Sequence, residues 1–223
     1  MEDLKIRCSA LGKIMTNPRS KSELLSKTCK TYLQELAKEE RWGITKEYKN
    51  KYFDKGNEVE DKSIQLANDV LGYGFLFKNE ESFSNDFITG TPDINTDEVL
   101  IEIKSSWDGT TFPFFEKDLP DKAYYYQLQG YMALTGKKKA YLCYCLVNTP
   151  DEMVADEVRR QHWKNYLIDD DDDLTAEVEA KHNFDHIEKS DRVKKYEVLF
   201  DEDLMQKIED RIKICRNYYK TLF

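Results

Sequence analysis

The first seventy residues carry apolar side chains at helical spacing. In the second segment, for example, Leu24, Leu25, Leu33 and Leu36 recur at intervals of three or four residues or their multiples. A Ser at a helix start and a Gly or Asn-Pro at its end are the usual boundary signals. These signals predict helices over residues 9–17, from Ser22 to about residue 40, and over roughly residues 46–71 before Gly72.

The hydrophobic period changes after residue 72. Short β-rich runs bounded by turn residues predict strands over 74–77, 86–89 and 99–103, and the nearly continuous apolar run 140–147 predicts a strand buried within a sheet. Residues 193–200 form a candidate edge strand. Helical spacing predicts further helices over 121–134, from Pro150 to about residue 167, and over 201–219.

This order of elements indicates an α/β protein with a mixed central β-sheet flanked by helices on both faces. The length of 223 residues fits one large domain better than two, and no stretch reads as a linker. We therefore expect residues 1–223 to form a single domain.

Composition narrows the class of protein. No apolar run is long enough to span a bilayer, and the first residues lack the apolar core of a secretion signal, so we expect a cytoplasmic protein. Five cysteines without CxxC spacing favour reduced thiols over a disulfide framework or a zinc ribbon.

The formal net charge of −9 is unusual for a protein that handles nucleic acid. However, DNA affinity depends on local Lys and Arg clusters, and the charges here are segregated. Basic residues gather between Lys13 and Lys30 and at 137–139, whereas acidic residues gather at 151–157, 201–203 and in the run Asp169–Asp173, which we expect to be a solvated loop.

Three charged residues stand out in the strand region. Glu102 and Lys104 are two residues apart on one strand, so both side chains leave the same face, while Ile101 and Ile103 point into the core. If a hairpin turns at 95–98, Asp93 approaches Glu102, and two adjacent carboxylates are costly unless they hold a cation such as Mg²⁺ or Mn²⁺. The Ile103 carbonyl is a plausible further ligand. The alternative is an exposed Glu–Lys pair worth under about 1 kcal/mol.

The pattern P-D, a short gap and E-x-K resembles the PD-(D/E)XK nuclease superfamily. Two further motifs resemble its phage lambda exonuclease-like branch. The helical Gly56-x-x-x-Glu60 implies a third acidic group at the metal site, with Glu58 as an alternative, and Gln127-x-x-x-Tyr131 implies side chains that orient or bind the substrate. The resemblance covers residues 6–148 and leaves 150–223 as a C-terminal extension.

The segment that begins at Ile6 resembles the opening helix of that family, in which a Ser grips a terminal 5′-phosphate. Ser9 occupies the matching position, at a helix N-terminus suited to anions. The family also uses an Arg several residues earlier, where this chain has none, and Arg7 is the candidate replacement.

The resemblance implies a Mg²⁺- or Mn²⁺-dependent DNA exonuclease of restriction-endonuclease-like fold, acting in phage-type recombination. Its expected substrate is duplex DNA, degraded from 5′ ends to leave 5′-phosphate. A single-strand annealing protein and a homotrimeric ring are the implied partners. The alternatives are an endonuclease of the same superfamily and a non-catalytic DNA-binding module with the same fold.

Overall fold

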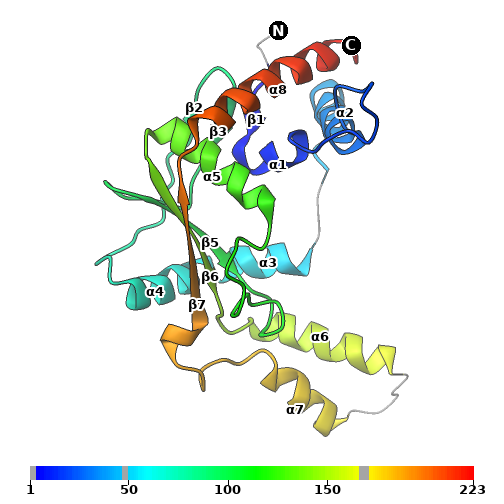
Figure 1. The fold of residues 1–223 in the computed structure, drawn as a ribbon. Coiled ribbons are helices and arrows are strands. Elements are labelled where there is room, and N and C mark those ends of the chain that lie inside the picture. The colour runs from blue at the N-terminus through cyan, green and yellow to red at the C-terminus, as the bar shows by residue number, and fades with distance from the viewer. Residues whose placement is uncertain (1–3, 47–49, 166–170) are drawn as a thin grey trace.

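The computed structural model describes residues 4–46, 50–165 and 171–223. A mixed four-stranded sheet runs through the described chain in the order β4-β5-β6-β7 (Figure 1). Its strands are β4 (Ile94–Asn95), β5 (Leu100–Ser105), β6 (Lys139–Cys145) and β7 (Val193–Leu199). The central pair, β5 and β6, is parallel, and the outer pairs are antiparallel. The predicted mixed sheet, the turn at 95–98 and the edge position of β7 are confirmed.

The two faces of the sheet bury different hydrophobic clusters because side chains alternate along each strand. Leu100 and Leu142 face one cluster, whereas Ile101 and Ile103 face the other. Glu102 therefore shares the face of Leu100, where an unpaired charge would be costly.

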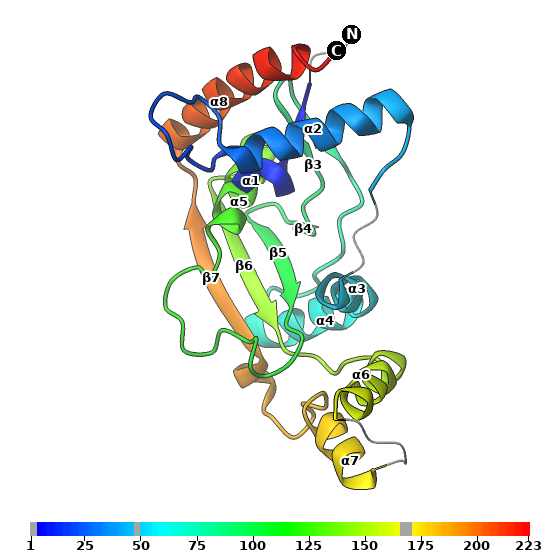
Figure 2. The same cartoon turned by 90° about the vertical axis from the view of Figure 1, so that its right-hand side faces the viewer.

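Helices cover both faces (Figure 2). The first face packs against α1 (Leu11–Ile14), α2 (Lys27–Trp42), α5 (Lys122–Thr135) and α8 (Glu202–Lys220). A small second sheet, in the order β1-β3-β2, lies beside them and is formed by β1 (Ile6–Arg7), β2 (Phe83–Ser84) and β3 (Ile88–Gly90). The short turns η1 (Cys8–Ala10) and η2 (Lys189–Arg192) lead into α1 and β7.

The second face packs mainly against α4 (Glu60–Leu71), which follows α3 (Lys51–Glu58). The helices α6 (Asp151–Lys164) and α7 (Asp172–Ala180) lie side by side at the end of the sheet farthest from α8 (Figure 1). Helices on both faces confirm the predicted α/β architecture.

The long helix predicted over 46–71 is interrupted. Residues 47–49 lie outside the described part of the chain, Asn50 caps α3, and Val59 leaves helical geometry at φ −107° and ψ 11°. Val59 is fully buried, so the bend turns an apolar side chain under the sheet and lets α4 bury Ile64 and Leu66.

Two boundaries in the first half differ from the prediction. The second helix is capped by Ser26, whose hydroxyl accepts a hydrogen bond from the Cys29 amide at 3.0 Å, and not by Ser22. Residues 74–77 form no strand: Phe75 and Phe77 are exposed and their rings stack on each other, so only Leu76 packs inward.

The acidic run is not the expected loop throughout. Asp169 and Asp170 lie outside the described residues, but Asp171 caps α7 by accepting a hydrogen bond from the Leu174 amide, and the next two aspartates form its first turn. Carboxylates are stabilising at this end because the helix dipole is positive there.

Two elements of the C-terminal third, β7 and α8, belong to the core. Met205, Ile208 and Ile212 of α8 join the cluster on the first face, and the Gln129 amide bridges the Leu199 carbonyl and the Asp201 amide. All five cysteines are unpaired and buried. Among the described helices, none combines the length and the apolar character that a membrane crossing needs.

Candidate active site

A cleft of about 620 Å³ opens between α3 and the end of β5. Strand, helix and loop residues line it: Asn50, Tyr52, Phe53, Gly56, Asn57, Glu60, Asp93, Ile103, Lys104, Ser105, Ser106, Trp107, Thr111, Tyr124 and Tyr144. A side chain starting at Gly56 would meet nothing within 4 Å, so this glycine leaves the cleft open rather than permitting close packing.

Asp93 enters the cleft from the residue before β4. Because Ile94 pairs with Ile101 in an antiparallel register, the next pair outward places Asp93 opposite Glu102. The Asp93 carboxylate accepts a hydrogen bond from the Ile103 amide at 2.8 Å, which fixes it against β5. The hairpin therefore brings the two predicted carboxylates together.

Glu102 lies beneath the cleft, with its side chain 3% exposed. Its Oε1 accepts hydrogen bonds from Lys104 Nζ and from Gln127 Nε2, both at 2.7 Å. Its Oε2 is buried, and no described residue makes a hydrogen bond to it. A buried carboxylate oxygen left unpaired is costly, so this atom is suited to a ligand that the protein does not itself supply.

Lys104 lies at the mouth of the same cleft, with a side chain 27% exposed. Burial alone would lower the pKa of Lys104, but the Glu102 and Asp93 carboxylates outweigh burial and raise it. Its ammonium also lies 5.2 Å from the centre of the Tyr124 ring, a cation–π contact. Lys104 is therefore held as a fixed positive charge next to two acids.

The electrostatics of Asp93 fit a divalent cation. Burial, and then the negative charge of Glu102, raise the pKa of Asp93 from 3.8 to about 8. Ionising both acids is thus unfavourable without an added positive charge. Mg²⁺ takes oxygen ligands and commonly uses one or two carboxylates, with water and substrate phosphate completing its shell. Asp93, the unpaired oxygen of Glu102 and the nearby Ile103 carbonyl match that donor set.

Glu60 lines the cleft from the first turn of α4, but its carboxylate is ion-paired with Lys78 at 2.5 Å. Within the described ranges, no group of three or more His, Cys, Asp or Glu side chains is placed to hold a metal ion. The predicted Gly56-to-Glu60 motif also crosses the break at Val59 and does not lie in one helix. Glu58, the alternative, is exposed and does not line the cleft.

Gln127 and Tyr131 share one face of α5, as predicted, and both are buried behind Glu102. The Gln127 amide donates to Glu102 and also to the Tyr131 hydroxyl, the latter at 3.0 Å. Neither residue lines the cleft. In this arrangement they fix the orientation of Glu102 rather than face the open space.

Ser9 and Arg7 lie outside the cleft lining, and both are exposed. Arg7 is the residue before η1, and Ser9 is the middle residue of that turn, so Ser9 is not the cap. Burial, and then the charge of Glu102, raise the pKa of the intervening Cys8 to about 12. Close packing of Cys8 on Gly90 and Gly130 holds the turn in place.

The sequence did not single out the aromatic wall opposite β5. Tyr52 and Phe53 of α3 line the cleft while remaining 51% and 62% exposed. Tyr124 also lines the cleft and lies three residues before Gln127 on the same helix face, and this spacing was the available signal. Trp107 is 5% exposed and packs edge-on against Tyr52 and His182.

The N-terminal basic residues border a second cleft of about 610 Å³ between α1, α2 and their connection. Lys13, Arg19 and Lys27 line it together with several hydroxyl groups and two acids, Glu23 and Glu35. The N-terminal basic residues thus gather around one cleft, with two acids among them.

Comparison with solved structures shows what this fold is similar to. The chain is 31% identical to a phage-related exonuclease from Haemophilus somnus 129PT, with 99% of this chain and 95% of that chain covered and a TM-score of 0.80. An alkaline exonuclease from Laribacter hongkongensis shares the fold at 16% identity, over 97% of this chain and 88% of that one, with a TM-score of 0.66. The structure of that protein with dAMP gives 17% identity and a TM-score of 0.65.

No protein-family model matches the chain, and the search of curated proteins found no match.

Proposed function

This chain belongs to the phage-related exonuclease family, with the restriction-endonuclease-like fold of PD-(D/E)XK nucleases, and on that premise we propose that it hydrolyses duplex DNA from 5′ ends in a Mg²⁺- or Mn²⁺-dependent reaction. The observation that carries the proposal is the junction of β4 and β5. There Asp93 lies opposite Glu102, one oxygen of Glu102 is buried and unpaired, and Lys104 lies beside both.

Asp93, Glu102 and the Ile103 carbonyl would hold the divalent cation, and Glu60 could join them by releasing Lys78. When bound, such a cation polarises a phosphodiester oxygen and makes water more acidic. Gln127 keeps Glu102 in place through its hydrogen bond, and Tyr131 in turn accepts a hydrogen bond from the Gln127 amide. Substrate contact by Gln127 or Tyr131 would require this pair to open.

Lys104 acts next to the attacked phosphate. Its raised pKa keeps it as an ammonium, so it orients the attacking water and offsets the charge that develops on the phosphate oxygens. Cleavage of the bond to the 3′ oxygen leaves a 5′-phosphate on the next nucleotide.

The substrate assignment rests on residues of both clefts. Exposed rings on α3 can stack on bases without sequence preference, and the basic cleft around Lys13 and Arg19 can neutralise backbone phosphates. Ser9 and Arg7, exposed on the turn next to Glu102, would contact a terminal 5′-phosphate.

An end-labelling experiment tests the proposal. Linear duplex DNA carrying a 5′-phosphate should release mononucleotides in Mg²⁺, and neither EDTA-treated reactions nor closed circular plasmid should be degraded. Cutting of closed circles would instead favour an endonuclease. Equal rates on 5′-phosphate and 5′-hydroxyl ends would argue against the roles of Ser9 and Arg7. If no divalent cation supported hydrolysis, the proposed nuclease activity would be refuted.

The family resemblance also leads us to propose a homotrimeric ring and a single-strand annealing protein as partners. Sedimentation equilibrium tests the ring, because a monomer at micromolar concentration would contradict it. Co-purification with the annealing protein of the same phage or prophage tests the second partner.

A further inference from the structure

The helix that forms one wall of the cleft is anchored by a lysine. Of the eight residues of α3, all of which the structure describes, only Lys55 is buried, and its exposed fraction is 0%. The rings of Tyr52 and Phe53 remain more than half exposed, although Tyr52 packs edge-on against Trp107. A helix that fully buries no apolar side chain gains less from the hydrophobic effect, so the buried polar contacts of Lys55 contribute much to its position.

The Lys55 ammonium donates two hydrogen bonds to main-chain carbonyls beyond the end of β5. One is to Ser106 at 2.8 Å and the other is to Trp107 at 2.9 Å. The acceptors lie two and three residues after Lys104 in the chain, and both residues line the cleft. Lys55 therefore joins the two walls of the cleft, although it does not line the cleft itself.

We propose that Lys55 is a positioning residue, which docks α3 against the end of β5 and so holds the exposed aromatic side of the cleft in place for DNA. This role rests on the proposed function. Lys55 itself is placed too deep to touch substrate.

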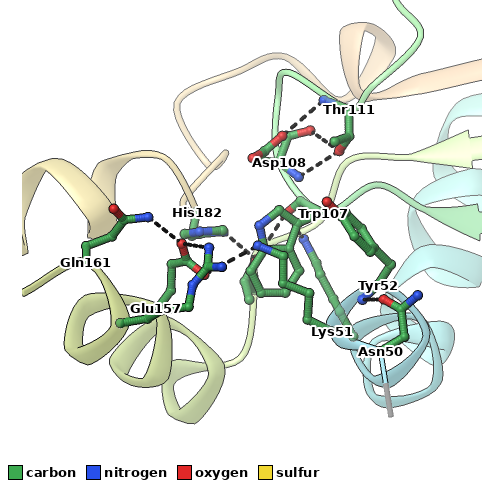
Figure 3. A network of polar contacts seen from close by, with 12 residues as sticks. Asn50, Lys51, Tyr52, Trp107, Asp108, Thr111, Glu157, Gln161 and His182 are labelled. Atoms are coloured by element: carbon green, nitrogen blue, oxygen red, sulfur yellow. Dashed lines mark hydrogen bonds and ion pairs between the residues drawn. The ribbon is translucent and has the colours of Figure 1, made fainter. Parts of the chain in front are cut away.

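The surroundings of Trp107 support this anchoring role. Figure 3 shows the Trp107 ring between residues of α3 on one side and His182 and Glu157 on the other. Lys51, one helical turn before Lys55, places its ammonium 4.3 Å from the centre of the Trp107 ring and 3.4 Å from Glu157. Lys51 and Lys55 thus both contact the loop that follows β5 and contains Trp107.

The protonation of Lys55 does not decide whether the contacts form. Burial, opposed by the charge of Asp108, lowers the pKa of Lys55 to about 7. The neutral amine still has two N–H groups, one for each carbonyl. Both hydrogen bonds can therefore persist when the proton is lost.

Removing the anchor should weaken DNA binding more than it weakens chemistry. The β5 wall is held by sheet hydrogen bonds, whereas α3 loses its buried contact and two carbonyls lose their donors. For Lys55→Met we expect KM for linear duplex to rise about tenfold, as for loss of a charged buried hydrogen bond, while kcat stays within about twofold.

Three measurements separate this effect from general destabilisation. Amide hydrogen exchange in Lys55→Met should accelerate in α3 while β5 and β6 remain protected. Lys55→Arg, which keeps N–H donors, should recover most of the duplex affinity. Lys62→Met is the matched control, since Lys62 is an exposed lysine on the next helix and should behave like the unmodified protein.

The proposal would be overturned if Lys55→Met left both KM and the amide exchange of α3 unchanged. It would also be overturned if kcat fell as much as duplex affinity and β5 lost as much protection as α3. If Lys55→Met does not fold, Lys51→Met provides the test, because it removes the Lys51 contacts with Trp107 and Glu157 and leaves the buried Lys55 in place. We then expect KM to rise about two- to threefold with kcat unchanged, and an unchanged KM would count against the anchor.

The proposed function can fail separately. If the unmodified protein does not hydrolyse DNA, affinity for a fluorescent duplex in Ca²⁺, together with α3 exchange, still tests Lys55.

Discussion

The two walls of the cleft are built in opposite ways. The β4–β5 wall is fixed by sheet pairing, by the Asp93–Ile103 hydrogen bond and by packing on both faces, and it carries the charged groups. The α3 wall has a single buried side chain and presents exposed rings. Chemistry needs distances fixed to a fraction of an ångström, whereas holding a polymer tolerates motion. The contrast indicates a division between catalysis and substrate holding, which substitutions on each wall can test.

The largest effect is expected for Lys104→Ala on the β wall. Loss of the ammonium removes stabilisation of the phosphate charge, so kcat should fall roughly 10³-fold. Affinity for duplex DNA should hold because the α3 wall is untouched. Single-turnover kinetics and fluorescence anisotropy measure the two quantities, with Lys195→Ala on the exposed side of β7 as control. Full activity in Lys104→Ala would show that the β4–β5 wall is not the catalytic wall.

Glu102→Gln should have the next largest effect. The amide keeps a single oxygen, which can serve either a cation or Lys104, places an N–H donor where the other oxygen was and loses the charge, so we expect roughly a 10²-fold loss of activity. The Mg²⁺ concentration that gives half-maximal rate should also rise. Glu197→Gln, on an exposed part of β7, is the control. An unchanged Mg²⁺ requirement would show that Glu102 is not a ligand.

A smaller effect is expected on the α3 wall. Phe53→Ala removes a ring on which a base can stack, so duplex affinity should fall about tenfold while kcat is retained. Phe75→Ala removes another exposed phenylalanine, outside the cleft lining, and should change neither quantity. If Phe53→Ala reduced kcat and spared affinity, the division between the walls would be wrong.

The smallest effect is expected on the pH dependence of the free energy of unfolding, through the titration of Lys55. Its folded-state pKa, about 7, is below the ordinary value of 10.5, so the unfolded chain binds more protons between these values. The Lys55 contribution to the free energy of unfolding should therefore rise with pH above about 7, by at most about 1.4 kcal/mol per pH unit. Urea titrations at pH 7, 8 and 9 measure the slope, which should be smaller in Lys55→Met. Equal slopes would show that Lys55 titrates normally.

The β wall could be predicted from the sequence, whereas the α3 wall could not. Asp93, Glu102 and Lys104 lie within one hairpin, so strand alternation and a short turn are enough to bring them together. The contacts of Lys55 could not be predicted because its two acceptors are main-chain carbonyls about fifty residues away. Every residue has such a carbonyl, so the sequence does not mark the acceptors. The Lys78 partner of Glu60 directly follows residues 74–77, which the sequence indicated as a strand and which form a loop.

The errors in the fold share one cause, which is tertiary packing. Ser22 and Ser26 are equivalent caps by local rules, and burial of Leu25 and Cys29 selects the second. Within the run 74–77, Leu76 joins the core beside α4 and β4, and the two flanking phenylalanines are left exposed. Likewise, local propensity would continue the helix through Val59, but the helix is interrupted there because the Val59 side chain packs against the sheet.

The contact between the first and last helices has a consequence during protein synthesis. The α1–α2 region packs on α8, and Arg216 donates a hydrogen bond to the Leu4 carbonyl. Translation at roughly 5–20 residues per second would delay α8 by on the order of ten to thirty seconds after α2 emerges. Until α8 emerges, the apolar face that α8 covers in the folded protein stays exposed on the nascent chain. We therefore expect a ribosome-bound chain truncated before residue 202 to recruit chaperones and to show no nuclease activity.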